Sequence, residues 1–262
     1  MDSPESFREQ LSETIEQLKA RLEFEAYFAV DYLPGSSLGP DRQLDNQVGP
    51  DSKQQVVTDL KADSLDSAEL IQSADNKQAR IKSLYQKTRT CAFCDLHKTR
   101  TNVVFGDGSL DAELVFIGEA PGHEEDISAK PFVGLAGGLL TKIINAMKFK
   151  RSDVYITNLL RCRPPNNRNP LPEEVVCCKP YLIELLEIIK PKVICTLGKF
   201  AAHTLLNQTI PISQLRGQWF EFKGIKLMPT FHPAYLLRNP QDKKLVWADM
   251  KKIMDVLNKY ET

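Results

Sequence analysis

The sequence has 262 residues, of which 42% are hydrophobic and 26% charged, and its formal net charge is zero. This content can bury a substantial core, and the length suits one ordinary domain with an appendage better than two equal domains. The N-terminus is acidic, and no window reaches the roughly 18 apolar residues of a membrane span. We therefore expect a cytoplasmic protein without a membrane anchor.

The zero total conceals two halves of opposite charge. Residues 1–80 carry 8 Lys/Arg against 16 Asp/Glu, a balance of −8, so residues 81–262 carry 26 against 18, a balance of +8. An acidic segment repels nucleic acid phosphates, whereas a basic domain attracts them. Any nucleic-acid contact is therefore expected from residues 81–262.

The first predicted element is an amphipathic helix over residues 6–28. Its apolar residues recur at spacings of four and three, as in Phe7, Leu11, Ile15, Leu18 and Leu22. Residues 33–77 are polar, acidic and rich in Gly, Pro and Ser, which predicts a largely disordered linker with at most a short helix over residues 56–71. We predict an N-terminal region of residues 1–80 whose partner the sequence does not identify.

From residue 81 the pattern changes to alternating strands and helices. Short β-branched runs at residues 112–118, 153–160 and 191–198 are each followed by a helical pattern, at residues 137–148, 172–190 and 199–208. Residues 217–233 predict a hairpin that leads to a final strand, and residues 241–260 predict a closing amphipathic helix. This order predicts an α/β domain over residues 81–262, with three αβα layers and a central, mainly parallel sheet. Ligands of such sheets bind outside the carboxyl ends of the strands.

Three of the predicted strands end in residues suited to a site. The first ends in "GEAPG", residues 118–122, where glycines allow the backbone to approach a ligand closely. The second ends at Asn158, and the last leads to His232 in "FHPAYLLRNP". Each alone fits an ordinary turn, cap or loop residue. Their shared position at strand ends indicates a functional site.

The six cysteines indicate metal binding or buried thiols, because a chain without a signal peptide rarely builds a disulfide scaffold. Cys91 and Cys94 form a C-x2-C pair, and Cys162 and Cys178 bracket a proline-rich loop of fifteen residues. Four such thiolates suit either an iron–sulfur cluster or zinc. Cys195 lies in an apolar strand and is expected to be a buried small hydrophobe.

The chain closely resembles the family 4 uracil-DNA glycosylases, the iron–sulfur branch of the uracil-DNA glycosylase superfamily. The resemblance covers roughly residues 81–259 and rests on the ordered motifs "CAFC", "GEAPG", "EED", "PFVGLAGGLL", "YITNLLRCRPPNNRNP" and "HPAYLLR". It implies a monomeric DNA repair enzyme that acts on uracil-containing DNA. The enzyme would hydrolyse the N-glycosidic bond of uracil, release the free base and leave an abasic site for base excision repair.

The resemblance also implies a cofactor. In that family a C-x2-C pair followed by C-x15-C holds a [4Fe–4S] cluster, which corresponds here to Cys91, Cys94, Cys162 and Cys178. The cluster of the family is thought to be structural. Cys177 adjoins a ligand position, but the alignment favours the second cysteine of the pair. A four-cysteine zinc site is the alternative.

The uracil pocket implied by the resemblance is formed at the strand ends. Phe132 would stack on the flipped base, and Asn158 would bind its polar edge with an amide that is both donor and acceptor. Backbone groups of Glu119 and Ala120 would complete the pocket. His232 would donate a hydrogen bond to the uracil oxygen on which negative charge develops.

The residue that orients the attacking water is open at the level of sequence. The best-known members of the superfamily carry an aspartate where this chain has Ala120. Glu119 and Glu125 are the nearby carboxylates, although an oxocarbenium-like sugar needs little help from a base. Glu125 with Asp126 also fits a solvated acidic loop.

The expected DNA contacts lie in the cluster loop and after His232. Phosphate contacts are expected from Arg161, Arg163, Arg168 and Arg238, and Leu236 or Leu237 is expected to fill the space that the flipped base vacates.

Three alternative functions fit the sequence less well. A non-catalytic nucleic-acid-binding module would not need the pocket residues, a relative that links covalently to uracil DNA carries a "KRRIH" loop absent here, and a dinucleotide-binding enzyme would show GxGxxG after the first strand.

Overall fold

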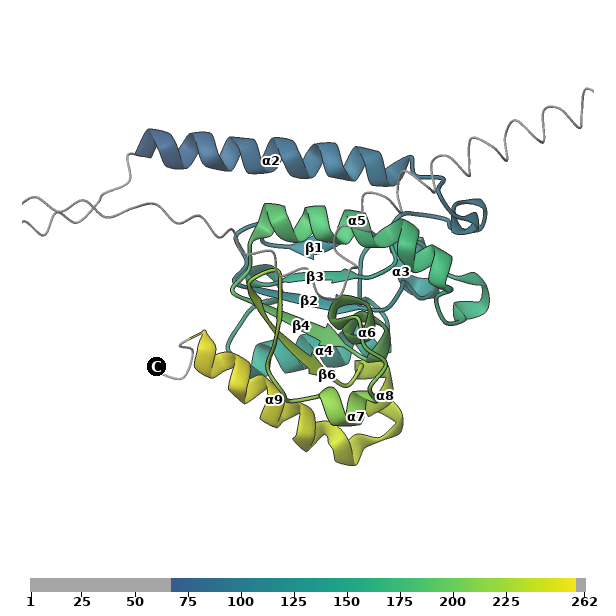
Figure 1. Cartoon of the computed structure of the whole chain (residues 1–262), viewed down its shortest axis with the longest axis vertical. Coiled ribbons are helices and arrows are strands. Elements are labelled where there is room, and N and C mark those ends of the chain that lie inside the picture. Colours follow the sequence, from purple (N-terminus) through teal and green to yellow (C-terminus); the bar gives the residue numbers. More distant parts are fainter. Residues whose placement is uncertain (1–66, 258–262) are drawn as a thin grey trace, which may run out of the picture. The chain divides into compact units, whose positions relative to one another are not determined.

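The structure, a computed structural model, describes residues 67–257, with side chains from residue 76; the helix predicted over residues 6–28 lies outside this range. Within it, six strands form one sheet in the order β1-β3-β2-β4-β6-β5 (Figure 1). The strands are β1 (Asp107–Gly108), β2 (Leu114–Gly118), β3 (Tyr155–Asn158), β4 (Val193–Leu197), β5 (Phe220–Phe222) and β6 (Ile225–Thr230). The helices are α2 (Ser67–Arg89), α3 (His123–Ser128), α4 (Leu135–Ala146), α5 (Pro172–Ile189), α6 (Lys199–Leu206), α7 (Ile212–Leu215), α8 (Pro233–Arg238) and α9 (Lys243–Val256). Short 3-10 turns are η1 (Asp95–Lys98), η2 (Arg151–Asp153), η3 (Pro165–Asn167) and η4 (Pro240–Asp242).

The sheet is mainly parallel, as predicted. The four central strands β3, β2, β4 and β6 run parallel, and the edge strands β1 and β5 pair antiparallel with their neighbours. The predicted hairpin is β5–β6, whose turn residues Lys223 and Gly224 have φ of 50° and 79°. Because the central strands share one direction, their carboxyl ends lie at one edge of the sheet.

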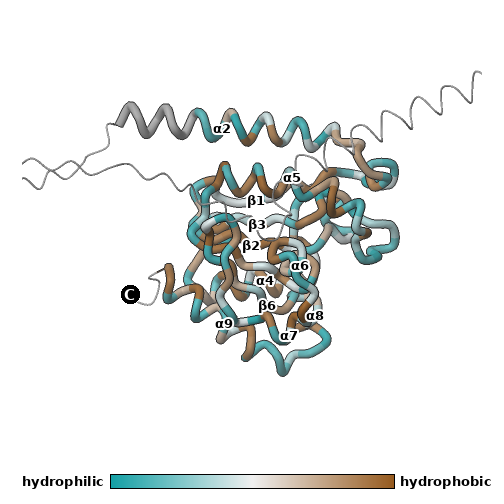
Figure 2. Tube along the Cα trace, in the orientation of Figure 1, coloured by the Kyte–Doolittle hydropathy of each residue, from teal (hydrophilic) through white to brown (hydrophobic). Residues whose placement is uncertain are grey.

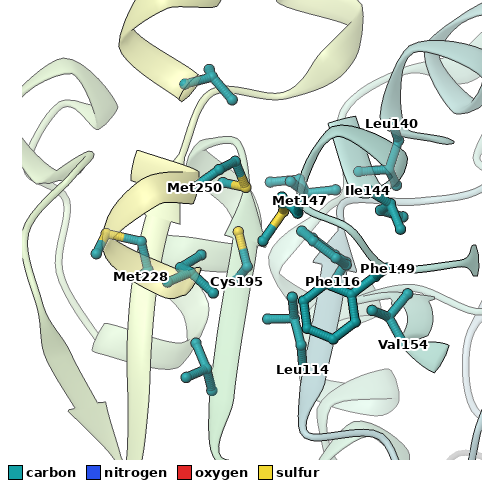
Figure 3. Packing of buried hydrophobic residues seen from close by; sticks show 14 of the residues in the cluster. Leu114, Phe116, Leu140, Ile144, Met147, Phe149, Val154, Cys195, Met228 and Met250 are labelled. Carbon is teal, nitrogen blue, oxygen red and sulfur yellow. The ribbon is translucent and has the colours of Figure 1, made fainter. Parts of the chain in front are cut away.

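Alternating residues of the strands face two separate layers of helices. In β2, Leu114 and Phe116 belong to one hydrophobic cluster with residues of α4 and α9 (Figure 3), whereas Val115 and Ile117 belong to a second cluster with residues of α5 and α6. Strands that are apolar on both faces are typical of a sheet covered on both sides. The predicted three-layer αβα architecture is confirmed.

Helix α2 crosses the predicted boundary at residue 80 without a break. It is largely hydrophilic, whereas α5 is hydrophobic on successive turns (Figure 2). The two helices are in contact, Leu84 of α2 is fully buried, and Lys77 forms an ion pair of 2.7 Å with Asp111. The end of the predicted linker is therefore helical. None of the helices in residues 67–257 is long and apolar enough to cross a membrane.

A buried ion pair supports the carboxyl end of β6. Asp249 of α9 is 1% exposed and accepts hydrogen bonds from Arg216, including one of 3.0 Å from Nε, and from the hydroxyl of Thr230 at 2.6 Å. The guanidinium of Arg216 also lies over the ring of Phe231. Burial raises the pKa of Asp249, while the bonds from Thr230 and Arg216 oppose this shift. The network holds the backbone that leads to His232.

Replacing Asp249 by alanine is expected to lower the free energy of unfolding by about 3–5 kcal/mol, because it leaves the Arg216 guanidinium buried without its partner. Chemical denaturation of the two proteins measures this difference. Asp255→Ala is the matched control, because Asp255 lies exposed on the same helix. A loss below about 1 kcal/mol for Asp249→Ala would show that the ion pair does not stabilise the fold.

Candidate active site

The carboxyl edge of the sheet brings four strand ends together. Gly118 at the end of β2 is the register partner of Asn158 at the end of β3. The N–H of Gly198, directly after β4, donates to the carbonyl of Thr230 at the end of β6 at 2.9 Å. A Cβ atom added to Gly198 would lie 3.1 Å from Cβ of His232. The predicted strand-end residues therefore share one edge.

The Asn158 side chain is buried, and its amide oxygen has no partner among residues 67–257. Asn158 is 2% exposed, and its Oδ1 forms no hydrogen bond within this part of the chain. A Cβ atom on Gly118 would lie 2.3 Å from this oxygen and 2.5 Å from Cζ of Phe132, so only glycine fits there. Buried amide oxygens are rarely left unpaired, which indicates that Asn158 faces a ligand position.

Phe132 lies beside Gly118, as the Asn158 amide does, and is held in an unusual backbone conformation. Its φ of 52° is in the left-handed region, which is strained for an aromatic residue. Its carbonyl accepts from Nη1 of Arg151 at 3.2 Å, and a Cβ on Gly137 would clash with the same carbonyl. The ring centroid of Phe132 lies 5.6 Å from that of His232. The stacking surface is thus fixed before any ligand binds.

Glu125 supports the Phe132 loop through both carboxylate oxygens. Oε1 accepts from the backbone N–H groups of Val133 at 2.9 Å and Gly134 at 3.0 Å, and Oε2 accepts from Gly122 at 3.1 Å. This links the "GEAPG" turn to the Phe132 loop. Three backbone donors occupy the carboxylate, so the geometry favours Glu119 over Glu125 as the group that orients water.

The contacts of His232 define its protonation. The N–H of Ala234 donates to Nδ1 of His232 at 3.1 Å, which assigns the proton of a neutral ring to Nε2. Burial lowers the pKa of His232 to about 4, the positive charge of Arg238 adds to this shift, and Glu125 opposes it. At neutral pH the ring is therefore an uncharged hydrogen-bond donor through Nε2.

Glu119 lies at this edge of the sheet, and the pKa of its carboxyl group is strongly shifted. Burial raises its pKa to about 7, and the positive charge of Lys199 opposes the shift. Its carbonyl accepts from the N–H of Leu160 at 2.9 Å, which continues the β2–β3 pairing beyond Asn158. Ala120 packs against a third cluster, which contains Leu96, Leu160, Cys94, Cys162 and Cys178. The "GEAPG" turn therefore lies between the strand-end residues and the cysteines.

The cysteines from three distant segments gather on the other side of this turn. Cys162 and Cys178 are 5% and 4% exposed and share a cluster with the partly buried Cys94. Arg100 donates from Nη1 to Sγ of Cys162 at 3.1 Å. In residues 67–257 no three His, Cys, Asp or Glu side chains stand at metal-ligand distances. The chemistry of the donor set, thiols beside guanidinium groups, nevertheless suits a thiolate-bound metal group.

Cys177 and Cys195 lie outside the four predicted ligands. The thiol of Cys177 donates to the carbonyl of Phe93 at 3.3 Å, within the "CAFC" loop, and its hydrogen bond to Cys94 lowers the pKa of Cys94 to about 7. The preference for Cys178 over Cys177 as a ligand therefore remains a prediction. Cys195 is fully buried in the core, as expected, and burial raises its pKa well above the usual value (Figure 3).

Comparison with known proteins agrees with this arrangement. The family model of the uracil DNA glycosylase superfamily matches residues 105–251. The chain belongs to this superfamily. It is 45% identical to the type-4 uracil-DNA glycosylase of Archaeoglobus fulgidus over 187 residues, which are 68% of this chain and 94% of the relative. It is 44% identical to that of Thermotoga maritima over 187 residues, covering 70% and 97%, and 44% identical to that of Saccharolobus solfataricus over 181 residues, covering 66% and 84%. The resemblance to the type-4, or family 4, uracil-DNA glycosylases is confirmed.

Two of the DNA contacts expected for this uracil-DNA glycosylase family member are contradicted by burial. Arg161 is 1% exposed, and its Nη1 donates to the carbonyl of Asn158 at 2.8 Å. Leu236 is fully buried in the core, because the one-turn register of α8 points it inward, whereas Leu237 is 43% exposed. Arg161 and Leu236 are covered by the protein in this structure, and Leu237 remains the predicted wedge residue.

The other predicted DNA residues differ in their surroundings. Arg163 donates from Nε to Oδ1 of Asn167 at 2.7 Å and lies at the surface of the cluster loop. Arg168 forms a two-pronged ion pair with Glu174, which ties this loop to the start of α5. Arg238 is exposed at the C-terminal end of α8. Arg163 and Arg238 remain candidates for phosphate binding, and Arg168 has a structural role.

Sequence reasoning missed Arg151, which holds the Phe132 loop, and gave no role to Gly137, which leaves space for the backbone of Phe132. Gly118 belongs to the predicted "GEAPG" turn and leaves space for the side chain of Asn158. Arg151 carries no sequence signal, because it lies nineteen residues from the carbonyl that it binds. The "LAGG" glycine did carry a signal, since a glycine within a helix indicates close backbone approach.

Proposed function

We propose that the chain is a uracil-DNA glycosylase that hydrolyses the N-glycosidic bond of uracil in DNA and leaves an abasic site for base excision repair. The carrying observation is the buried Asn158 amide, whose Oδ1 has no partner among the described residues and which meets Phe132 at Gly118, together with the neutral His232, whose ring centroid lies 5.6 Å from that of Phe132. The names of its type-4 relatives support the same activity. The enzyme acts as a monomer on DNA in the cytoplasm.

Each of the proposed site residues has a separate role in the reaction. The flipped uracil stacks on Phe132, and its polar edge pairs with the amide of Asn158. As the bond to the sugar breaks, the electron pair leaves with uracil, and Nε2–H of His232 donates to the uracil oxygen that gains negative charge. Water adds to the sugar carbon and loses a proton, and uracil leaves as the free base. Glu119 orients this water and accepts its proton.

The cofactor of the proposed enzyme is a [4Fe–4S] cluster held by Cys91, Cys94, Cys162 and Cys178. When bound, it joins three distant segments of the chain and has a structural role. We expect the purified protein to be brown, with about four irons per chain. A colourless protein with one zinc per chain would contradict this assignment.

Uracil release provides the test of the activity. The purified protein is incubated with an oligonucleotide that carries one uracil and with a matched oligonucleotide that carries thymine at that position. Free uracil is measured directly, and abasic sites are cleaved with alkali. We expect release from the uracil strand alone. Tight binding to the uracil strand with no free base would show that the protein is a binding module.

The role of Glu119 predicts a pH dependence. Its carboxylate form is populated above its pKa of about 7, so the single-turnover rate is expected to rise with pH through about 7 and level off above it. Glu119→Gln should lower the plateau by about 10²-fold, the lower end for loss of a general base, and remove the inflection. Glu125→Gln is the control. It disturbs the Phe132 loop, but the rate should keep its inflection near pH 7, because Glu119 is unchanged. An inflection that persists in Glu119→Gln would assign the titration to another group.

A further inference from the structure

The backbone at Phe132 is strained, and the strain decides where the ring lies. Its φ of 52° is in the left-handed region, and a Cβ atom on Gly137 would lie 1.9 Å from the Phe132 carbonyl oxygen. On the other side, a Cβ atom on Gly118 would lie 2.5 Å from Cζ of the ring. A strained backbone conformation persists only where surrounding contacts hold it. The groups that bind the backbone of this segment therefore set the position of the ring.

Arg151 binds both carbonyls that flank the strained residue. Its Nη2 donates to the carbonyl of Pro131 at 2.5 Å, and its Nη1 donates to the carbonyl of Phe132 at 3.2 Å. These carbonyls belong to the two peptide planes that meet at the Cα atom of Phe132, and the rotations of the planes about this atom are φ and ψ. The guanidinium is a rigid planar fork, so one side chain restrains both angles.

The guanidinium of Arg151 is itself held by a helix and by the edge strand of the sheet. Its Nη1 also donates to the hydroxyl of Thr141 on α4 at 3.3 Å, and this hydroxyl donates to the carbonyl of Gly137 at 3.0 Å. Its Nε lies 3.7 Å from Oδ2 of Asp107 on β1. The Arg151 side chain is 24% exposed, which limits competition from water. The Phe132 segment is thereby attached to both α4 and β1.

We propose that Arg151 is a positioning residue for base binding, because it holds Phe132 in the conformation that places the ring beside Gly118 and the Asn158 amide. This inference rests on the proposed function. Arg151 acts through Phe132, and a ring that is placed before the base arrives loses no freedom when the base stacks on it. Loss of Arg151 should therefore weaken binding of the base and leave the binding of DNA without a base unchanged.

The test is a double-mutant cycle in the full chain, with Arg151→Met, Phe132→Ala and the double variant. The single-turnover rate of uracil release, the inhibition constant of free uracil and the affinity for an oligonucleotide with an abasic site are measured. Thermal denaturation shows that each variant is folded. Stacking of a base on an aromatic ring is worth roughly 5- to 150-fold in affinity, so we expect Arg151→Met to weaken free uracil and slow release by about 10-fold. Affinity for the abasic oligonucleotide should stay at the wild-type value.

The Phe132→Ala background separates positioning from a general structural role. With no ring left to place, Arg151→Met should change the rate and the inhibition constant by less than about 2-fold, the usual limit of additivity. An equal loss with and without the ring would overturn the proposal, because it would show that Arg151 only stabilises the fold. If Arg151→Met does not fold, Thr141→Val removes one contact of the guanidinium and is carried through the same cycle with the same two outcomes.

Two further variants test geometry against charge. Arg151→Lys keeps the charge but lacks the planar fork, so it should resemble Arg151→Met in its affinity for free uracil. Wild-type affinity in Arg151→Lys would overturn the proposal, since the charge alone would then be sufficient. Lys150→Met is the matched control, because Lys150 is the exposed neighbour, and it should release uracil at the wild-type rate. A wild-type protein that releases no uracil would overturn the proposed function instead, before any variant is compared.

Discussion

Replacing His232 by alanine is expected to lower the single-turnover rate of uracil release by roughly 10²–10³-fold, the size typical for removal of one donor to a developing oxyanion. The neutral ring, with its proton on Nε2, donates a hydrogen bond that strengthens as charge develops on uracil. The affinity for DNA should change little, because this bond is strongest in the transition state. Rapid-mixing measurements with enzyme in excess give the rate, and filter binding gives the affinity.

The low pKa of His232 adds a second expectation. Since the ring is neutral above about pH 4, it should contribute no inflection between roughly pH 5 and 9, and activity should fall only as the pH approaches 4. His232→Gln should recover part of the rate, because its amide also donates. His203→Ala is the control, because His203 lies on α6 and its ring binds the carbonyl of Ile210. If His232→Ala abolishes DNA binding together with release, the histidine positions the loop and does not act on the leaving group.

Replacing Asn158 by aspartate is expected to lower uracil release by roughly 10³-fold. The change removes the amide donor and places a carboxylate against the polar edge of uracil. Each effect costs about 1–3 kcal/mol of binding free energy in the transition state, and together they cost about 4 kcal/mol. The Oδ1 of Asn158 has no protein partner, so the base is the group left to complete its hydrogen bonding. Single-turnover assays on the uracil oligonucleotide measure the loss.

The same substitution should admit cytosine, whose exocyclic amine donates where uracil accepts. Release of cytosine from an ordinary cytosine oligonucleotide, absent with wild type, would be the gain of function. Asn145→Asp is a matched control, because Asn145 lies exposed on α4. If Asn158→Asp excises uracil at the wild-type rate, the amide does not bind the base, and its burial has only a structural role.

Local patterns were sufficient to predict the architecture and the position of the site. Strand runs such as "AELVFIG" are apolar on both faces, which predicts a sheet covered on two sides without any knowledge of the helices that cover it. Asn158, "GEAPG" and His232 follow strands in the sequence, and parallel strands place such residues at one edge. Motif resemblance then added the role of each residue.

The tertiary structure decided between neighbours that look equivalent in the sequence. Arg161 and Arg163 lie in the same "RCRPP" segment, yet only Arg161 is buried, because β3 directs it toward Thr157 and the ring of Phe105. Leu236 and Leu237 are adjacent, and the register of α8 buries the first and exposes the second.

Glu119 and Glu125 also differ in their surroundings, although both are carboxylates near the same turn. The backbone N–H groups that occupy Glu125 come from residues three to nine positions away in the chain, and Glu119 owes its raised pKa to burial at the sheet edge. The sequence by itself therefore determined which residues reach the site, because strand order and apolar periodicity are local properties. Only the tertiary structure decided which of these side chains are buried and which groups they bind, because both depend on how the folded chain packs around each residue.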